Sequence, residues 1–295
     1  MSRSGRPVLR YHGGKWLLAP WILGFFPPHR CYVEPFGGAA SVLMRKPRSY
    51  AEVYNELDDE VVNVFRVLRS PTRARRLAAL LRLTPFSRDD FAAAYRASKD
   101  PVERARRTLV KAFMGFGSNS LHDLRPPGST ARAPTGFRAT SNRAGTTPAH
   151  DWQHFPGHIA GFCERLQGVV IERREAQEVM AQHDAPATLH YVDPPYLPET
   201  RTGLNKRRQH GVLAMYRHEF SADDHRELAV FLRGLRGMVV LSGYASPLYE
   251  ELYEGWERHE RQALADGARP RTECLWLNPA CVAARRGQQA QLVAL

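Results

Sequence analysis

Short apolar runs alternate with helix-like segments along much of the chain. Between positions 59 and 69 apolar residues recur with helical spacing, whereas runs such as 189–192 are short and continuous. Because strands that alternate with helices form parallel sheets, the pattern predicts an α/β fold built on such a sheet. The predicted strands are 31–33, 50–54, 169–172, 189–192, 238–242 and 274–277. The predicted helices of this part are 39–44, 59–69, 176–182, one that starts after Ser221 and ends at Gly237, and 247–253.

The middle of the chain has a different pattern. Three helices are predicted there, which start after Ser70, after Ser87 and at Pro101. The stretch 115–157 that follows is rich in Gly, Ser, Thr, Pro and Arg and has little periodicity, which predicts a long loop or hairpin region. We therefore predict one α/β domain that is interrupted by a helical insert. The resulting parts are 1–65, the first half of the α/β domain, 66–160, the insert, and 161–295, the second half of the same domain.

The insert also carries a cluster of positive charge. The full chain has 42 Lys and Arg residues against 30 Asp and Glu residues, a formal net charge of +12. Between Arg66 and Lys111 the basic residues are opposed by only four acidic residues. Such a cluster predicts a polyanionic partner, most often nucleic acid. The alternative, a solvated face that serves solubility, explains the clustering less well.

The four cysteines, Cys31, Cys163, Cys274 and Cys281, are scattered and form no C-x-x-C pair. This argues against a zinc site and against a disulfide framework, so we expect no metal and a reducing, cytoplasmic setting. The basic start of the chain is not followed by an apolar segment, and no apolar stretch is long enough to span a bilayer. We therefore expect neither a signal peptide nor a membrane span.

Four residues at the end of the predicted strand 189–192 carry the strongest chemical signal. Asp193-Pro194-Pro195-Tyr196 combines a carboxylate, two rigid prolines and an aromatic ring. Open α/β sheets bind their ligands at the carboxyl ends of strands, so this segment predicts the reactive site.

Two further turns at strand ends predict the type of ligand. Gly37 and Gly38 lie between a strand and a predicted helix, which lets a ligand approach the backbone closely. Glu56, with Asp58 beside it, follows the next strand, where nucleotide-binding sheets place a carboxylate that accepts hydrogen bonds from ribose hydroxyls. Each feature alone also suits an ordinary turn or a helix cap, but together they indicate an adenosine-containing ligand.

The segment Tyr11-His12-Gly13-Gly14-Lys15 narrows the choice of ligand. Its glycines can form a tight turn, and its lysine can donate to a carboxylate. The G-x-x-x-x-G-K-[ST] spacing of phosphate loops is absent. A lysine for a carboxylate and an acid for a ribose fit S-adenosylmethionine better than ATP or NAD.

These motifs follow one another as in the α-group of Dam-type, D12-class DNA adenine-N6 methyltransferases, and the chain resembles a phage or prophage member of that family. The resemblance spans nearly the whole chain and fails mainly over 115–157. It implies a Rossmann-like, S-adenosylmethionine-dependent methyltransferase sheet with a helical, basic DNA-recognition insert. Residues 1–65 would then be the cofactor-binding half of the catalytic domain, 66–160 the target-recognition insert and 161–295 the catalytic half. The matching segments are 11–15, 33–41, the acidic turn through Glu56, 193–196, 241–244 and 271–276.

The resemblance implies a role for each motif. Asp193 and the main-chain carbonyl of Pro194 would accept the two hydrogens of the adenine amino group, which directs its lone pair toward the methyl donor. Pro195 would stiffen the turn, and Tyr196 would stack on an adenine flipped out of double-stranded DNA. Many relatives have Asp where Glu56 stands here. The implied cofactor contacts are Tyr11, Lys15, Glu34, Pro35, Phe36, Gly37, Gly38, Glu56 and Asp193, with Glu175 and Ala176 near the adenine ring of the cofactor.

The target and the DNA contacts leave alternatives. The catalytic segment also suits the N4 amino group of cytosine, and a DNA-binding relative without turnover is a third possibility, although such a protein gains nothing from Asp193. The family implies a monomer in the cytoplasm of a bacterial or phage-infected cell, with restriction-modification, phage protection and regulation as alternative roles. The insert residues of a type that reads bases or phosphates are Asn119, Arg125, Arg138, Asn142 and Arg143.

Overall fold

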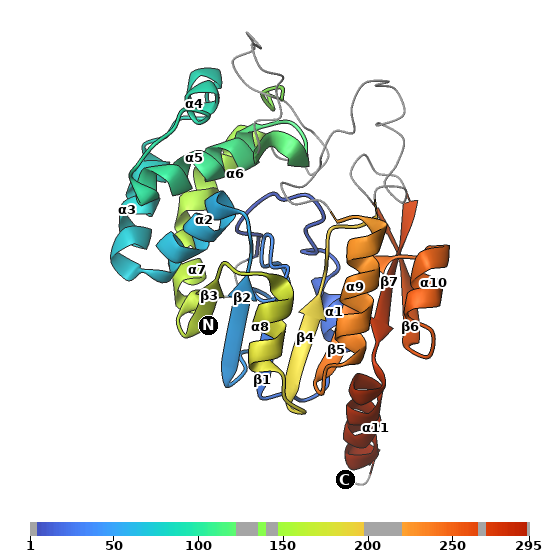
Figure 1. The fold of residues 1–295 in the computed structure, drawn as a ribbon. Helices are drawn as coiled ribbons and strands as arrows, with labels where there is room; N and C mark the ends of the chain where they lie inside the picture. The colour runs from blue at the N-terminus through green and yellow to red at the C-terminus, as the bar shows by residue number, and fades with distance from the viewer. Residues whose placement is uncertain (1–4, 122–134, 140–146, 198–219, 265–269, 294–295) are drawn as a thin grey trace. The chain divides into compact units, whose positions relative to one another are not determined.

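The computed structural model describes residues 5–121, 135–139, 147–197, 220–264 and 270–293 (Figure 1). The chain divides into two compact units, each built from separate stretches of sequence. The helical unit comprises Met1–Trp16, Gly38–Met44 and Asp58–Gln167. The sheet unit comprises Leu17–Gly37, Arg45–Leu57 and Gly168–Leu295.

The sheet unit is built on a seven-stranded sheet in the order β3-β2-β1-β4-β5-β7-β6. The first five strands in that order are parallel, whereas β7 is antiparallel to β5 and to β6. The strand order reverses between β1 and β4, and open α/β sheets bind ligands at such a point, outside the carboxyl ends of the strands. The predicted Rossmann-like class is therefore confirmed. The strands are β1 (Cys31–Glu34), β2 (Ala51–Asn55), β3 (Val169–Glu172), β4 (Thr188–Val192), β5 (Met238–Tyr244), β6 (Glu257–Leu264) and β7 (Pro270–Leu277).

Helices cover both faces of this sheet (Figure 1). Helices α8 (Ala176–His183) and α9 (Ala222–Arg233) lie on one face, and α1 (Ala19–Leu23) lies behind it. The short helix α10 (Pro247–Leu252) follows β5, and α11 (Pro279–Val293) follows β7. All five residues of β4 are buried, as expected for a central parallel strand covered on both faces.

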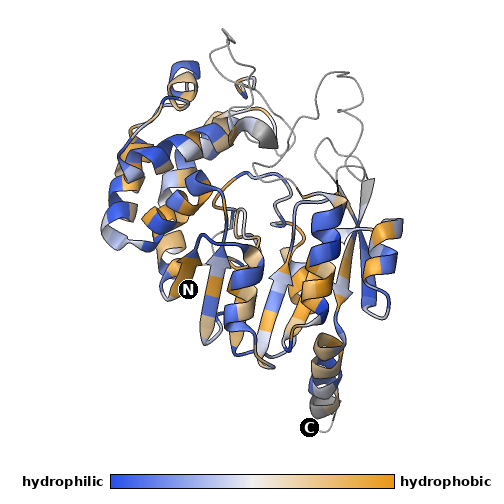
Figure 2. Cartoon of the chain, viewed as in Figure 1, coloured by the Kyte–Doolittle hydropathy of each residue, from blue (hydrophilic) through white to orange (hydrophobic). Residues whose placement is uncertain are grey.

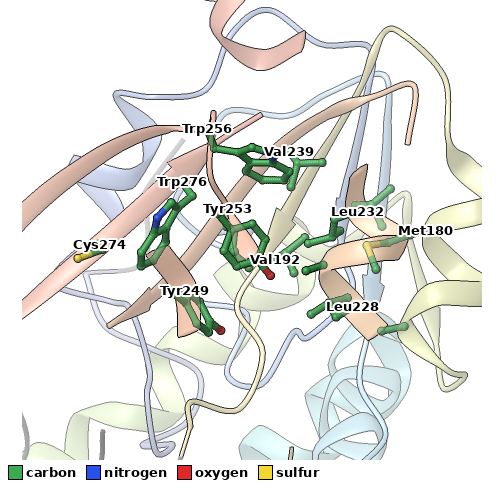
Figure 3. Close-up of a cluster of buried hydrophobic side chains, with 14 of the residues drawn as sticks. Met180, Val192, Leu228, Leu232, Val239, Tyr249, Tyr253, Trp256, Cys274 and Trp276 are labelled. Carbon is green, nitrogen blue, oxygen red and sulfur yellow. The ribbon is translucent and has the colours of Figure 1, made fainter. Parts of the chain in front are cut away.

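Apolar side chains from α8, α9, β4, β5, α10 and β7 form the core of the sheet unit (Figure 3). Helix α9 begins at a capping box formed by Ser221 and Asp224, and it buries Leu228, Ala229 and Leu232. Figure 2 shows the matching alternation of hydrophilic and hydrophobic residues along α9. Tyr249, Tyr253, Trp256 and Trp276 form the aromatic part of this core.

The helical unit packs its helices around a second core. Helix α2 lies against α5 and α7, and α3 lies against the same two helices. Phe65, Leu77, Leu109, Phe155 and Phe162 are fully buried there. The elements of this unit are α2 (Asp59–Arg69), α3 (Pro71–Arg82), α4 (Arg88–Ala93), α5 (Pro101–Met114), η1 (Ser118–Leu121), α6 (Pro148–His154), η2 (Phe155–His158) and α7 (Ile159–Leu166).

Some sequence predictions of elements were wrong. The predicted helix 39–44 is a run of turns, because Gly38 and Ala40 both adopt positive φ angles of 47° and 52°, which a right-handed helix excludes. Helix α9 ends at Arg233, with Gly234 rather than Gly237 as its C-cap. The predicted loop region 115–157 contains η1, α6 and part of η2. Helices α1, α7 and α11 and strand β6 were not predicted.

The same region also contains the stem of a hairpin. Gly115 and Phe137 form an antiparallel bridge, and the backbone N–H of Phe116 donates to the carbonyl of Gly136 at 2.8 Å. Phe137 packs on Phe86 and Phe91, with ring-centroid distances of 5.1 and 6.0 Å. The hairpin alternative of the sequence analysis therefore holds at its base.

Among the helices within the described ranges, none combines the length and apolar character needed to cross a bilayer.

Candidate active site

The turn after β1 is packed directly against the neighbouring strand. A Cβ atom at Gly37 would lie 2.1 Å from Cε2 of Tyr54, a fully buried ring on β2, so only glycine fits this position. Glu34, the last residue of β1, is 2% exposed and accepts a hydrogen bond of 2.7 Å from the Tyr32 hydroxyl. The turn therefore packs its backbone against the Tyr54 ring, and a buried carboxylate precedes it.

Asn55 joins the ends of three strands. Its Nδ2 donates to the carbonyl of Pro35 after β1 and to the carbonyl of Arg174 after β3, both at 2.9 Å. Its Oδ1 accepts from the backbone N–H of Arg174 at 3.0 Å, and its own carbonyl accepts from Gly37 N at 2.8 Å. Asn55 was not predicted as a site residue. The signal for it in the sequence is an amide at a strand end, a group that can donate and accept at the same time.

The two acids after Asn55 have different environments. Asp58 is 1% exposed and caps α2 by accepting from the backbone N–H of Glu60 at 2.9 Å. Glu56 is half-buried, and its Oε1 accepts from the backbone N–H of Leu57 at 2.9 Å. Glu56 is therefore the acid of this pair that remains suited to a ligand.

The segment Asp193–Tyr196 directly follows β4, as predicted. Asp193 and Pro195 are half-buried, whereas Pro194 and Tyr196 are buried. The Tyr196 hydroxyl lies 3.1 Å from Ser242 Oγ and donates to Oε2 of Glu273 at 3.0 Å.

Carboxylates and tyrosines gather near the carboxyl ends of β1 and β4. Burial is the main cause that raises the pKa of Tyr196 well above its usual value, and the carboxylates of Asp193 and Glu273 add to it. Burial also raises the pKa of Tyr191, to which Asp193 and Glu34 contribute. The tyrosine hydroxyls therefore stay protonated beside negative side chains. Such an edge favours a ligand that carries positive charge.

The remaining predicted cofactor residues of the sheet unit lie at strand or helix ends. The Phe36 ring packs edge-on against Phe220 with a centroid distance of 5.6 Å. Glu175 is exposed at the N-cap of α8, and Ala176 is buried as the first residue of that helix. The sheet unit thus brings Glu34, Pro35, Phe36, Gly37, Glu56 and Asp193 to the ends of three strands, β1, β2 and β4.

Tyr11, Lys15 and Gly38 belong to the helical unit. The backbone N–H of Gly14 donates to the carbonyl of Tyr11 at 3.1 Å, which closes the predicted turn. Lys15 is 4% exposed, and its Nζ donates to the carbonyl of Gly13 at 2.8 Å. A Cβ atom at Gly38 would lie 3.1 Å from the Tyr11 ring, so this glycine and this ring are in close contact.

Most of the predicted DNA-binding residues lie outside the described residues, namely Arg125, Asn142 and Arg143. Asn119 lies in η1. Arg138 is half-buried next to the hairpin stem, and its backbone N–H donates to the carbonyl of Met114 at 2.8 Å.

Internal ion pairs occupy several basic residues of the insert. Glu103 pairs with both Arg106 and Arg107, and the hydrogen bond from Arg106 is the main cause that lowers the pKa of Glu103 to about 2. By contrast, Arg73, Arg75 and Arg82 are exposed on α3 and form no ion pair within the part of the chain that the structure describes. The further ion pairs are Arg76–Asp100, Arg104–Asp59 and Lys111–Glu60.

The fold and the candidate site together define a Rossmann-like α/β protein with acidic side chains at the carboxyl ends of β1, β2 and β4. A model of the D12 class N6 adenine-specific DNA methyltransferases matches residues 11–266, and the chain belongs to this family. The predicted family is confirmed, and adenine N6 is favoured over cytosine N4.

The chain is similar to several characterised methyltransferases over most of its length. It is 23% identical over 266 residues to the DNA adenine methylase of Escherichia coli (strain K12), and the aligned region covers 87% of each chain. It is 22% identical over 261 residues to the DNA adenine methylase of Salmonella typhi, with 85% of each covered. It is 27% identical over 276 residues to the Type II methyltransferase M1.LlaDCHI of Lactococcus lactis subsp. cremoris, with 88% of each covered.

Proposed function

We propose that the protein transfers the methyl group of S-adenosylmethionine to the N6 amino group of adenine in double-stranded DNA. The observation that carries this proposal is the position of Asp193–Tyr196 at the carboxyl end of β4, next to the point where the strand order reverses. Family membership supplies the class of reaction, and the position of this segment supplies the residues.

The residues of the sheet unit fit S-adenosylmethionine. When bound, this cofactor supplies an electrophilic methyl group on a positively charged sulfur. Glu34 and Asp193 place negative charge at the strand ends, which suits a ligand with positive centres. Gly37 lets the turn after β1 pack against Tyr54 at the strand ends, and Glu56 offers a carboxylate for ribose hydroxyls. The proposed contacts of Tyr11 and Lys15 rest on the sequence resemblance.

The proposed chemistry uses hydrogen-bond acceptors rather than a strong base. The adenine amino nitrogen is a poor nucleophile because its lone pair is delocalised into the ring. The Asp193 carboxylate and the Pro194 carbonyl accept its two hydrogens, which localises the lone pair and directs it at the methyl carbon. The amino nitrogen would then bond to the methyl carbon as that carbon's bond to sulfur breaks, with the electrons of the broken bond left on sulfur. The methylated nitrogen would release one proton to solvent.

The target base must leave the duplex to reach Asp193. Enzymes that act on a base inside duplex DNA flip it into a pocket, and an aromatic face stabilises the flipped base. We assign that face to Tyr196, whose hydroxyl is held by Ser242 and Glu273. The proposal extends to a monomer in the cytoplasm of a bacterial or phage-infected cell, with double-stranded DNA as its partner.

Sequencing of modified bases in the genome of a bacterial host that expresses the chain tests this function. We expect N6-methyladenine in one sequence context with the natural chain and none with Asp193→Ala. Unmodified adenine in a host that accumulates the folded protein would overturn the proposal. Methylated cytosine in its place would show that the target base is cytosine.

A further inference from the structure

Side chains from the last parallel strand, β5, and from the antiparallel strand beside it, β7, reach the catalytic segment. Ser242 on β5 and Glu273 on β7 are 1% and 7% exposed, and both contact the Tyr196 hydroxyl. Neither residue is part of the motif at 193–196, and they lie 46 and 77 positions further along the chain.

The register of β5 and β7 explains why these side chains meet. Tyr244 pairs with Glu273 across the antiparallel ladder, so both side chains point to the same face of the sheet. Ser242 lies two positions before Tyr244 and therefore shares that face. The Tyr244 ring packs edge-on against the Tyr196 ring with a centroid distance of 4.5 Å. One face of the β5–β7 pair thus holds both the ring and the hydroxyl of Tyr196.

A buried carboxylate at this place needs an explanation. Burial of a charged group is costly unless it is hydrogen-bonded, and an apolar residue would fill the same space without that cost. The Glu273 carboxylate accepts a hydrogen bond from the Tyr196 hydroxyl, and this directional contact fixes the Tyr196 ring more closely than apolar packing alone would.

We propose that Glu273 and Ser242 are positioning residues that fix Asp193 and Pro194 through the Tyr196 hydroxyl. This inference rests on the proposed function of the same segment. Only two prolines separate Asp193 from Tyr196, and each proline has a φ angle fixed by its ring, so few soft torsions connect the two ends. Anchoring Tyr196 therefore anchors the carboxylate and the carbonyl that hold the amino group.

Tyr196→Phe tests the proposal because it removes the hydroxyl and keeps the ring. We expect kcat for DNA methylation to fall about tenfold to hundredfold, as for a small misplacement of reacting groups, with the KM values for DNA and cofactor within about twofold of those of the natural chain. The matched control is Tyr249→Phe, which removes a buried hydroxyl 3.1 Å from His225 Nδ1 in the core of the sheet unit. The control should lose stability in thermal unfolding and retain kcat.

Substitutions at Glu273 separate positioning from support of the fold. Glu273→Gln keeps an acceptor for the hydroxyl and should retain more of kcat than Glu273→Ala. The double variant Tyr196→Phe/Glu273→Ala should be no slower than the slower single variant, because both changes remove the same contact. Retained cofactor binding, measured by calorimetry, identifies the folded variants.

Two results would overturn the positioning role. One is a kcat for Tyr196→Phe equal to that of Tyr249→Phe, and the other is a set of variants that change only KM or the unfolding temperature. Either result counts against the positioning role only when the natural chain methylates DNA in the same assay. A natural chain that does not methylate DNA would instead refute the proposed function itself.

Discussion

The Nδ2 atom of Asn55 lies 2.9 Å from the carbonyl oxygen of Pro35. This hydrogen bond fixes the turn after β1 to the end of β2, and the same nitrogen also reaches the segment after β3. Glu56, the proposed ligand of the cofactor ribose, is the next residue in the chain. The position of Glu56 therefore depends on the hydrogen bonds of its neighbour Asn55, which also fix the backbone that carries Glu56.

Replacement of Asn55 should affect both stability and cofactor binding. Asn55→Ala leaves the carbonyls of Pro35 and Arg174 without their donor, and the loss at the buried Pro35 carbonyl should cost about 1–3 kcal/mol of unfolding free energy. We also expect weaker binding of S-adenosylmethionine, measured by calorimetry, because the turn and Glu56 lose their common support.

Asn63→Ala is the matched control for this experiment. Asn63 also donates to a proline carbonyl at 2.9 Å, that of Pro101 in the helical unit. Its loss should lower stability and leave the dissociation constant of the cofactor unchanged. Equal effects of the two variants on that constant would contradict the role given to Asn55.

The neighbouring acids Glu56 and Asp58 should respond in opposite ways. Glu56→Gln should weaken cofactor binding with little change in stability, because its carboxylate is the proposed ribose ligand. Asp58→Ala should cost about 1 kcal/mol of stability through loss of the α2 cap and leave cofactor binding intact. Calorimetry and chemical denaturation of both variants decide the matter, and an unchanged dissociation constant in Glu56→Gln would remove this residue from the site.

The sequence predicted most of what is local in this structure. Helix α2 was predicted with its observed bounds, because Asp58 caps its start and its apolar residues recur with helical spacing. The strand before Asp193 was predicted from its continuous apolar run, which reflects burial on both faces.

What the sequence did not predict depends on partners far along the chain or on backbone geometry. Ser242 and Glu273 gain their roles only when β5 and β7 pair beside Tyr196. The helix predicted over 39–44 fails because of the φ angle of Ala40, which composition does not reveal. Strand β6 is rich in charged residues, as edge strands often are, and so lacks an apolar signal.

The ion pairs of the insert predict which arginines bind DNA phosphates. Arg73→Gln, Arg75→Gln and Arg82→Gln should each weaken DNA binding, and each residue that contacts a phosphate should reduce the slope of log Kd against log salt by about 0.9. Arg106→Gln should mainly reduce stability, because Arg106 is bound to Glu103. Fluorescence anisotropy across a salt series provides the slopes. An unchanged slope in the triple variant of α3 would refute DNA contact by that helix.

His190 on β4 should make the protein less stable in mild acid. Burial lowers its pKa from 6.5 to about 4, so the folded state resists a proton that the unfolded chain accepts. Stability is then complete above pH 6.5 and falls as the pH drops from 6.5 toward 4. Between pH 7 and pH 5 this residue should account for about 2 kcal/mol of lost unfolding free energy.

His190→Leu isolates that contribution. Denaturant titrations at pH 7 and pH 5 should show a smaller loss of stability in the variant than in the natural chain. The same loss in both proteins would show that His190 does not titrate in this way.

Methyl transfer by the purified protein tests the central claim most directly. The natural chain and Asp193→Ala are each incubated with S-adenosylmethionine and unmethylated double-stranded DNA, and the digested nucleosides are separated by mass. We predict N6-methyldeoxyadenosine with the natural chain and none with Asp193→Ala, although the variant still binds the DNA. N4-methyldeoxycytidine in place of the adenine product, or equal methylation by the two proteins, would contradict the account.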